Sequence, residues 1–504
     1  MTLNRRLLRP LLTTAVAALL IGSGSFSAPA SAVPRKPGQP AQPVTIFSEG
    51  FSAAPRDRVS LVTDYTGATK GGEPRQNTPS ADINNAGQRY VVAEPWLSDG
   101  SCNGIILASS TSAGVTEPDN AYDCPGSAYG NIRGLATAVA RVSGDHDESG
   151  NRVLSAYTLE GAGNNATQLE TKTAVRLTAH RFYTAAISAA ATSCGADNDQ
   201  GPRSRLRFLD ADGRLLTGAS QIGVSVLDVC RDEHSVSYAR SALGGTMTEG
   251  SRVRANARLS ARAALLARDT DVRVRLMNDN GSEFGNKGVI DNLRILDVTP
   301  QLDKRFSSAT RRPGQVTLLM FTVTNTAELG AKDGWSFTDR LPAGMRVAGS
   351  EVESTCAADV TARRGARRIT VGAGTLAVGA RSCTIEVPVA ASRIGSYLNG
   401  PGNLGAVGGL NLPGQARVVY REPAASPSAS SSPSSSSSSA PSSSTPPPAG
   451  PSADSGPGSA ARAAQELPGT GSAVPLWVLV AAGALLVSGG VLVSVGLRRR
   501  AKGL

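Results

Sequence analysis

Residues 272–276 read Val-Arg-Val-Arg-Leu, and residues 383–389 read Cys-Thr-Ile-Glu-Val-Pro-Val. In both stretches every second residue is apolar, which is the period of a β-strand with one buried face. Similar short runs, separated by glycine and asparagine, recur between residues 45 and 422. The sequence therefore predicts an all-β protein. For residues 252–268, which are rich in alanine, arginine and leucine, we favour strand over helix.

The N-terminus carries an export signal. Basic residues precede an apolar run at residues 11–21, which is too short for a comfortable membrane span. Ala30 and Ala32 then form an A-x-A site for signal peptidase. We expect residues 1–32 to be a signal peptide, followed by a proline-rich lead over residues 33–44.

The C-terminus carries a pattern typical of a single membrane span. Residues 475–497 contain no ionisable side chain over 23 positions, and an α-helix needs roughly 20 residues to cross a bilayer. Clustered cations follow at residues 498–504 and stay on the cytoplasmic side. We expect a transmembrane helix at 475–497, a cytoplasmic basic tail, and the rest of the chain outside.

Composition also predicts a stalk. Residues 423–466 are almost entirely serine, proline, alanine and glycine. Such a segment buries too little apolar area to offset the entropy of ordering, so we expect it to be disordered.

The high net charge comes mostly from the two ends. Of the formal +11, three positive charges lie in residues 1–32 and four in residues 471–504, which leaves +4 for residues 33–470. Aromatic residues make up only 4% of the chain, and the arginines are dispersed. These features argue against a nucleic-acid partner.

The six cysteines fall into three pairs that are local in sequence. We expect disulfides within these pairs, because an exported protein meets an oxidising compartment, although spacing alone permits other pairings. The pairs are Cys102 with Cys124, Cys194 with Cys230, and Cys356 with Cys383.

Neither a zinc-type spacing nor a familiar catalytic motif is present, so we expect no enzyme. Paired carboxylates of a wall-attached hydrolase are a weaker alternative.

Five residues stand just before the apolar span: Leu467, Pro468, Gly469, Thr470 and Gly471. With the span and the basic tail they resemble the LPxTG sorting signal of Gram-positive surface proteins. The resemblance implies that a sortase recognises Leu467 and Pro468 and attacks the Thr470–Gly471 bond with a cysteine thiolate. Thr470 would then be joined to peptidoglycan, which converts a membrane-anchored precursor into a wall-bound protein.

Residues 300–422 contain an ordered series of motifs. They are Leu-Asp-Lys-Arg-Phe at 302–306, Phe-Thr-Val-Thr-Asn at 321–325, Phe-Thr-Asp-Arg-Leu-Pro-Ala-Gly at 337–344 and Gly-Ser-Tyr-Leu-Asn at 395–399. The series resembles an Ig-like repeat domain of unknown function found in bacterial surface proteins. The resemblance implies a β-sandwich of about seven strands, with Leu319, Phe321 and Val323 facing the opposite sheet.

Residues 45–299 resemble a jelly-roll binding domain at their two ends. Phe-Ser-Glu-Gly-Phe at 47–51 and Val-Ile-Asp-Asn-Leu-Arg-Ile at 289–295 are similar to its first and last strands, which lie side by side. Such domains often bind carbohydrate, and some hold a structural calcium. The acid-rich turns that offer oxygen ligands lie at residues 145–148, 197–199 and 210–213, although ordinary hairpin turns have the same composition. We interpret Asp291 as a strand-edge residue rather than a ligand, and we expect no other cofactor.

Three further residues suggest a covalent link. Some Ig-like surface domains carry a Lys–Asn isopeptide bond promoted by a buried acid, and Lys304, Asn325 and Asp339 are the required types. The alternative is a surface lysine and two turn residues.

A saccharide site would need exposed aromatic side chains as stacking platforms. We expect Trp335 to be buried in the core, and for Trp96 we leave open whether it is buried or exposed.

Together these patterns predict a secreted surface protein of the cell wall, which displays a β-rich head that binds an unknown host, matrix or glycan ligand. The alternative is a structural spacer or coat protein without a specific ligand. An exposed aromatic or a calcium-lined concavity would favour adhesion. A smooth polar surface with both mature tryptophans, Trp96 and Trp335, buried would favour the spacer.

Overall fold

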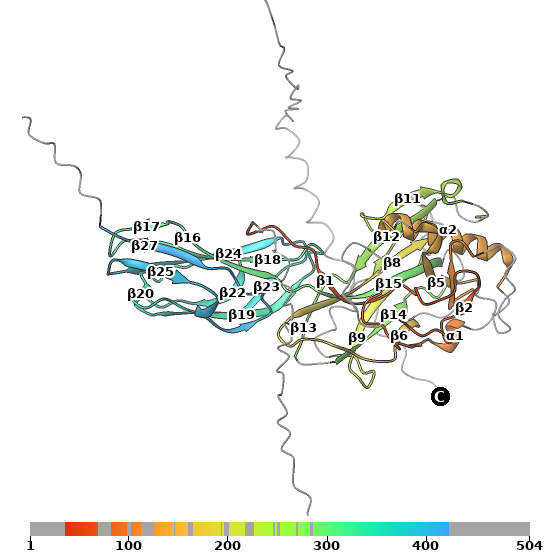
Figure 1. The fold of residues 1–504 in the computed structure, drawn as a ribbon, viewed down its shortest axis with the longest axis horizontal. Helices are drawn as coiled ribbons and strands as arrows, with labels where there is room; N and C mark the ends of the chain where they lie inside the picture. Colours follow the sequence, from red (N-terminus) through yellow and green to blue (C-terminus); the bar gives the residue numbers. More distant parts are fainter. Residues whose placement is uncertain are drawn as a thin grey trace, which may run out of the picture. The chain divides into compact units, whose positions relative to one another are not determined.

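The computed structural model describes residues 36–68, 82–97, 102–111, 124–145, 147–159, 165–192, 194–195, 201–216, 226–244, 247–248, 252–268, 271–282 and 286–422 (Figure 1). All of them fall within one compact unit, Met1–Ser426. The predicted signal peptide, stalk, sorting motif, transmembrane helix and basic tail lie outside the described residues. Within the described ranges, no helix is both long and apolar enough to span a bilayer.

The described residues of the N-terminal lobe form two antiparallel sheets. The larger runs in the order β11 (Val236–Ala239), β12 (Arg252–Ser260), β8 (Phe182–Ala191), β15 (Lys287–Asp297), β5 (Arg152–Tyr157), β4 (Ile105–Ala108) and β2 (Ser60–Leu61). Beside it, β1 (Val44–Glu49) pairs with β15, and β13 (Leu265–Leu266) pairs with β8. The smaller runs β10 (Leu227–Asp228), β9 (Arg203–Leu209), β14 (Asp271–Asn278), β6 (Ala166–Thr171) and β3 (Tyr90–Val91), with β7 (Val175–Arg176) beside β14.

A buried core lies between these two sheets, as the alternating pattern predicts. Val272, Val274 and Leu276 on β14 are fully buried in it, together with Ile290 and Ile295 from β15. The arginines between the β14 apolar residues point to the other face, where Arg273 and Arg275 both pair with Glu170 of β6. The all-β sandwich expected from the sequence is confirmed, and residues 252–268 contain the predicted strand as β12 and β13.

The two ends of this lobe meet as expected. Strand β1 pairs with β15 in antiparallel register, from Val44 opposite Asp297 to Glu49 opposite Leu293. The first and last strands of the jelly-roll-like lobe therefore lie side by side.

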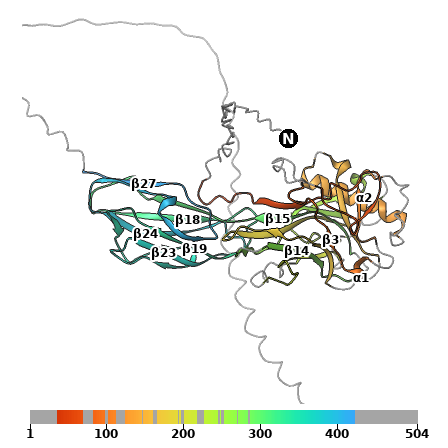
Figure 2. The ribbon, with the colours of Figure 1, turned by 60° about the horizontal axis from the view of Figure 1, so that its bottom comes forward.

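One helix forms a third layer that the sequence analysis did not predict. Helix α2 (Gly126–Ser143) packs on the face of the larger sheet that is turned away from β14 and β3 (Figure 2). Its apolar residues Ile132, Leu135 and Val139 recur at helical spacing and enter a second core with Val153 and Val253 of the sheet. The shorter helices of the described residues are α1 (Glu94–Leu97), η1 (Glu148–Gly150), η3 (Arg240–Leu243) and η4 (Pro401–Asn403).

The C-terminal lobe is an Ig-like sandwich. In the described residues one sheet runs β16 (Gln301–Phe306), β18 (Val316–Thr324), β24 (Ser382–Ala391) and β20 (Met345–Val347), with β21 (Glu353–Ser354) beside β24. A second runs β22 (Ala357–Thr361), β23 (Arg368–Leu376), β19 (Lys332–Arg340) and β26 (Leu404–Gly408). A third joins β17 (Thr310–Arg311), β27 (Ala416–Tyr420) and β25 (Gly395–Asn399).

The core of this lobe confirms the predicted inward face of β18. Leu319, Phe321 and Val323 are fully buried. The ring of Phe321 packs on that of Phe337 from β19, with centroids 5.0 Å apart. Burial of these side chains holds the two larger sheets together.

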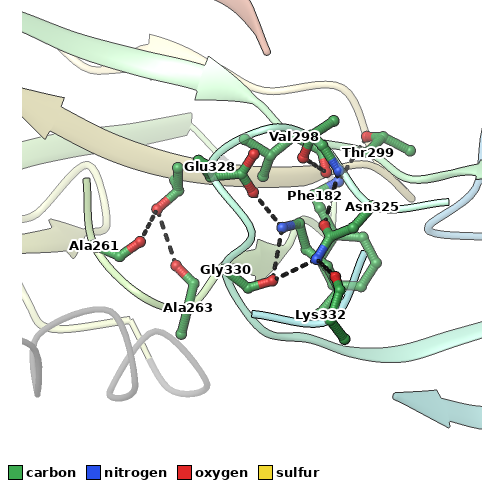
Figure 3. Close-up of polar contacts among 12 residues, drawn as sticks. Phe182, Ala261, Ala263, Val298, Thr299, Asn325, Glu328, Gly330 and Lys332 are labelled. Atoms are coloured by element: carbon green, nitrogen blue, oxygen red, sulfur yellow. Dashed lines mark hydrogen bonds and ion pairs between the residues drawn. The ribbon is translucent and has the colours of Figure 1, made fainter. Parts of the chain in front are cut away.

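The two lobes share part of this core at their junction (Figure 3). Phe182 from β8 and Val298 after β15 belong to the same buried cluster as Phe321 and Trp335. The Phe182 amide donates to Oγ1 of Thr299 at 3.0 Å. Gly409 has a φ of +69° and approaches the Phe182 ring so closely that a Cβ there would lie 2.5 Å from it. Phe182 is therefore closely packed between the two lobes.

The three predicted disulfides are confirmed. Cys102–Cys124, Cys194–Cys230 and Cys356–Cys383 are bonded, with Cα atoms about 5 Å apart in each pair. The six cysteines of the chain are all used by these three bonds.

Candidate functional site

In two of the acid-rich turns that suggested calcium, an aspartate side chain accepts hydrogen bonds from residues of the same turn. Asp147 accepts hydrogen bonds from the Gly150 amide and the Ser149 hydroxyl and pairs with Arg56 at 2.8 Å. Asp210 accepts from the Arg214 amide at 2.8 Å. In the part of the chain that the structure describes, no group of three or more acidic, histidine or cysteine side chains could hold a metal ion. Residues 197–199 and His146 lie outside that part.

Asp291 is not the strand-edge residue that we expected. It lies on β15, which is flanked by β8 on one side and by β5 and β1 on the other, and it is fully buried. The register of β15 with β8 shifts immediately after Asp291. Its carboxylate accepts hydrogen bonds from the amide and side chain of Asn292 at 2.6 and 3.0 Å. The shift lets a polar residue turn inward at the centre of a sheet, a placement that the local sequence does not reveal.

The tryptophans do not provide a stacking platform. Trp335 is 0% exposed, as expected, and Trp96 is 1% exposed within the core between the two N-terminal sheets. Three tyrosines near Trp96 in the sequence were further candidates for stacking. Tyr90 is buried in the same core, Tyr129 on α2 is partly buried, and Tyr122 lies outside the described residues. Burial of both tryptophans is therefore one of the two conditions set for the spacer role.

Glu49 forms a buried carboxylate site at the end of β1. Oε1 accepts from the Phe51 amide at 2.7 Å and from the Tyr65 hydroxyl at 2.8 Å. Oε2 accepts from the Asn85 side chain at 2.9 Å and from the Tyr90 hydroxyl at 2.5 Å. Burial, together with the charge of Asp82, raises the pKa of Glu49 to about 7, although its hydrogen bonds lower it.

Glu49 should make the stability of the lobe depend on pH. A raised carboxyl pKa means that the folded state holds the proton more tightly than the unfolded state, so stability falls as pH rises from 4.5 to about 7. Relative to Glu49→Gln, the wild-type protein should lose about 3 kcal/mol over this range. Urea unfolding at several pH values measures the difference, and parallel pH curves for the two proteins would contradict it.

A shallow cleft of about 470 Å³ lies beside α2. Its walls carry hydroxyls from Ser109, Thr111 and Thr137, together with Arg133 and Glu148. Arg133 donates to the carbonyl oxygen of Thr111 at 2.6 Å, which ties the helix to the loop after β4. The three hydroxyls already donate to main-chain carbonyl oxygens, those of Glu148, Arg56 and Arg133 respectively. They are therefore left as acceptors toward a ligand.

A second buried polar site lies in the C-terminal lobe, where three strands each place a polar residue at an inward position. On β16, Lys304 takes the buried position after Leu302. On β19, Asp339 follows Trp335 and Phe337 on the buried face. On β25, Asn399 follows Tyr397 in the same way. The period of two therefore aims an amine, a carboxylate and an amide into the same core.

These three groups contact one another directly. Nζ of Lys304 lies 2.8 Å from Oδ2 of Asp339, 2.6 Å from Oδ1 of Asn399 and 2.9 Å from the carbonyl oxygen of Gly400. Nδ2 of Asn399 donates to Oδ1 of Asp339 at 2.8 Å. The side chains of Lys304 and Asp339 are both 0% exposed. Burial lowers the pKa of Lys304, although the neighbouring Asp339 raises it.

The structure corrects the predicted partner of Lys304. Lys304 is not a surface lysine, and Asp339 lies beside it as the isopeptide hypothesis required. Asn325, however, belongs to a different turn, where its Nδ2 donates to the carbonyl oxygens of Gly330 and Ala380 at 3.1 and 2.9 Å. The residue that sequence reasoning missed is Asn399, which closes the Gly-Ser-Tyr-Leu-Asn motif and could have been found there.

The same lobe contains a second buried lysine, shown in Figure 3. Lys332 is also 0% exposed and pairs with Glu328. Its Nζ donates to the main-chain carbonyl oxygen of Gly330 at 3.0 Å, and the Asn325 side chain donates to that same oxygen. Burial lowers the pKa of Lys332, against the opposing effect of Glu328. The two lysines thus differ in whether the amine contacts a side-chain amide carbonyl.

The described residues define an all-β protein with a jelly-roll-like lobe, an Ig-like lobe and a buried Lys–Asp–Asn site. Residues 300–419 match the family described as Domain of unknown function (DUF7933). No curated protein matches the chain.

Solved structures that the chain is similar to include two surface proteins. One is the N-terminal domain of the Streptococcus gordonii adhesin Sgo0707, at 9% identity and a TM-score of 0.22, covering 51% of this chain and 61% of that chain. The other is BcpA, the major pilin subunit of Bacillus cereus, at 9% identity and a TM-score of 0.21, covering 47% of this chain and 69% of that chain. The match thus spans about three fifths of the first structure's length.

Proposed function

We propose that this is a secreted surface protein that a sortase joins to peptidoglycan through Thr470. The observation that carries the secretion step is the use of all six cysteines in three disulfides, since such bonds persist in oxidising compartments and are rare in reducing ones. The anchoring step rests on the order of the sorting motif, the apolar run and the basic tail.

Within this proposal, the two β-lobes act as a structural surface unit. Both mature tryptophans are buried, and the described residues offer no metal cluster that would shape a calcium-dependent site. These observations support the spacer or coat role over saccharide binding through aromatic stacking.

Adhesion through the head is the second candidate, and the cleft beside α2 favours it. The hydroxyl oxygens of Ser109 and Thr137 line the cleft and would accept hydrogen bonds from a polar ligand without an aromatic platform. A glycan and matrix-protein array probed with the protein tests this role. Binding that Thr137→Ala weakens would support it, and silence across the array would leave the structural role.

Pro468→Ala should prevent wall anchoring. Proline gives the motif its fixed kink, whereas Gly469 occupies the variable position, so Gly469→Ala is the matched control. In a host with an active sortase, wild type and Gly469→Ala should be released by muramidase and not by detergent. Pro468→Ala should be released by detergent with its C-terminal peptide attached. Release of intact wild type by detergent alone would refute the proposal.

A further inference from the structure

We propose that Lys304 and Asn399 become joined by a side-chain amide bond between Nζ and Cγ, with Asp339 as the acid–base group. The inference does not depend on wall anchoring, because it rests on the buried contacts among these three residues alone. It assigns a covalent modification site to the C-terminal lobe, and the reaction needs no cofactor or second protein.

Proximity is the first requirement of this reaction, and the fold meets it. Nζ lies 2.6 Å from Oδ1 of Asn399, so the amine is held against the carbonyl group that it must attack. Neighbouring contacts with Asp339 and Gly400 fix the amine from two other sides. Reactants held in such a geometry avoid most of the entropy cost of a bimolecular encounter.

Activation of the nucleophile is the second requirement. An ammonium group has no lone pair, so Lys304 must lose a proton before it attacks. Oδ2 of Asp339 lies 2.8 Å from Nζ and can take that proton within the buried pair. Burial favours the neutral pair, because moving a proton from the amine to the carboxylate removes two charges from a core without solvent.

Departure of ammonia as the leaving group is the third requirement of this reaction. Nζ forms a bond with Cγ of Asn399, and the bond between Cγ and Nδ2 breaks. Oδ1 of Asp339 already accepts from Nδ2 at 2.8 Å, so the carboxyl group can return a proton to that nitrogen. One ammonia leaves, nothing is oxidised or reduced, and the new amide keeps Asp339 as its hydrogen-bond partner.

Lys332 shows what the site requires. It is equally buried and has its own carboxylate, Glu328, but its Nζ contacts the main-chain oxygen of Gly330. Attack on that peptide group would cut the chain instead of releasing ammonia. The proposed reaction is therefore specific to Lys304, where the carbonyl belongs to a side-chain amide.

The bond would connect β16 to β25, whose reacting residues are 95 positions apart in sequence. A pulling force applied to the two ends of the C-terminal lobe would then pass through this bond and not through β18, β19, β23 and β24. Those strands would stay folded under tension.

Mass spectrometry of the purified full chain tests the proposal. The wild-type mass should be lower than the sequence requires by one ammonia. Trypsin should leave a branched product that joins residues 295–305 to residues 394–417, because acylated Lys304 is no longer cut. Asp339→Asn should abolish the mass loss, and Lys332→Met/Glu328→Gln, which removes the other buried pair, should retain it.

A folding control is needed because Asp339→Asn leaves a lysine without its counter-charge. Lys304→Met/Asp339→Asn removes both charges, and its circular dichroism should match wild type while its mass shows no loss. An unmodified wild-type mass would overturn the proposal. Linear peptides that hydroxylamine cleaves at Asn399–Gly400 would also overturn it, because they show that the ammonia was lost by forming a succinimide. A branched peptide that joins Lys332 to Asn325 would overturn it as well.

Discussion

Replacing Asp339 with asparagine is expected to lower the free energy of unfolding of the C-terminal lobe by about 3–5 kcal/mol. Lys304 is fully buried, and Asp339 is the carboxylate that pairs with it. Without that charge, the core must hold an unpaired ammonium group or deprotonate it, and either costs free energy of folding. The covalent bond would not form either, so the measured free energy of unfolding would describe a C-terminal lobe without the cross-link.

The double variant Lys304→Met/Asp339→Asn separates these causes. Neither variant can form the bond, so any difference between them reports the stranded charge alone. The double variant should recover about 2 kcal/mol or more, because a buried pair can often be replaced by groups of similar volume at little cost. Urea unfolding measures both values. Equal stability of the single and double variants would show that the loss has another cause.

Phe182→Ala is expected to cost about 3–5 kcal/mol, the usual range for removing a buried aromatic side chain. Phe182 begins β8 of the N-terminal lobe, yet it is fully buried in the core cluster of the C-terminal lobe. Gly409 approaches its ring from the second lobe, so truncation opens a cavity at the junction itself.

Phe208→Ala is the matched control for this junction. Phe208 is equally buried, but it lies on β9 in the core between the two N-terminal sheets. Both variants should lose similar stability, while only Phe182→Ala should make the lobes unfold in separate steps. Hydrogen exchange of β19 and β26, compared with that of β5, resolves the steps. Identical exchange patterns in the two variants would show that the lobes are not coupled through Phe182.

The buried Lys–Asp–Asn site could be predicted in part from the sequence. Lys304, Asp339 and Asn399 each stand inside one of the motifs that suggested an Ig-like domain, at residues 302–306, 337–344 and 395–399. Asn325 stands in another of those motifs and is the same residue type, so residue type alone could not choose between the two asparagines. The choice depends on which strand ends reach the same point of the sandwich.

Other features were decided by packing. Helix α2 has apolar residues at helical spacing, but its many glycine and alanine residues make that signal weak beside the strong alternation of the strands. Trp96 could not be placed from sequence, since large aromatics occur in cores and at surfaces alike. Asp291 was misjudged because only the sheet order makes β15 a central strand.

The amino-acid sequence by itself determined the strands, their inward faces and the local disulfides, because a period of two and a short loop are properties of neighbouring residues. Tertiary structure alone decided which distant groups meet. The contact between Lys304 and Asn399 spans 95 positions and requires β16, β19 and β25 to be stacked in one arrangement. That arrangement is fixed by burial of the shared core and not by any local pattern.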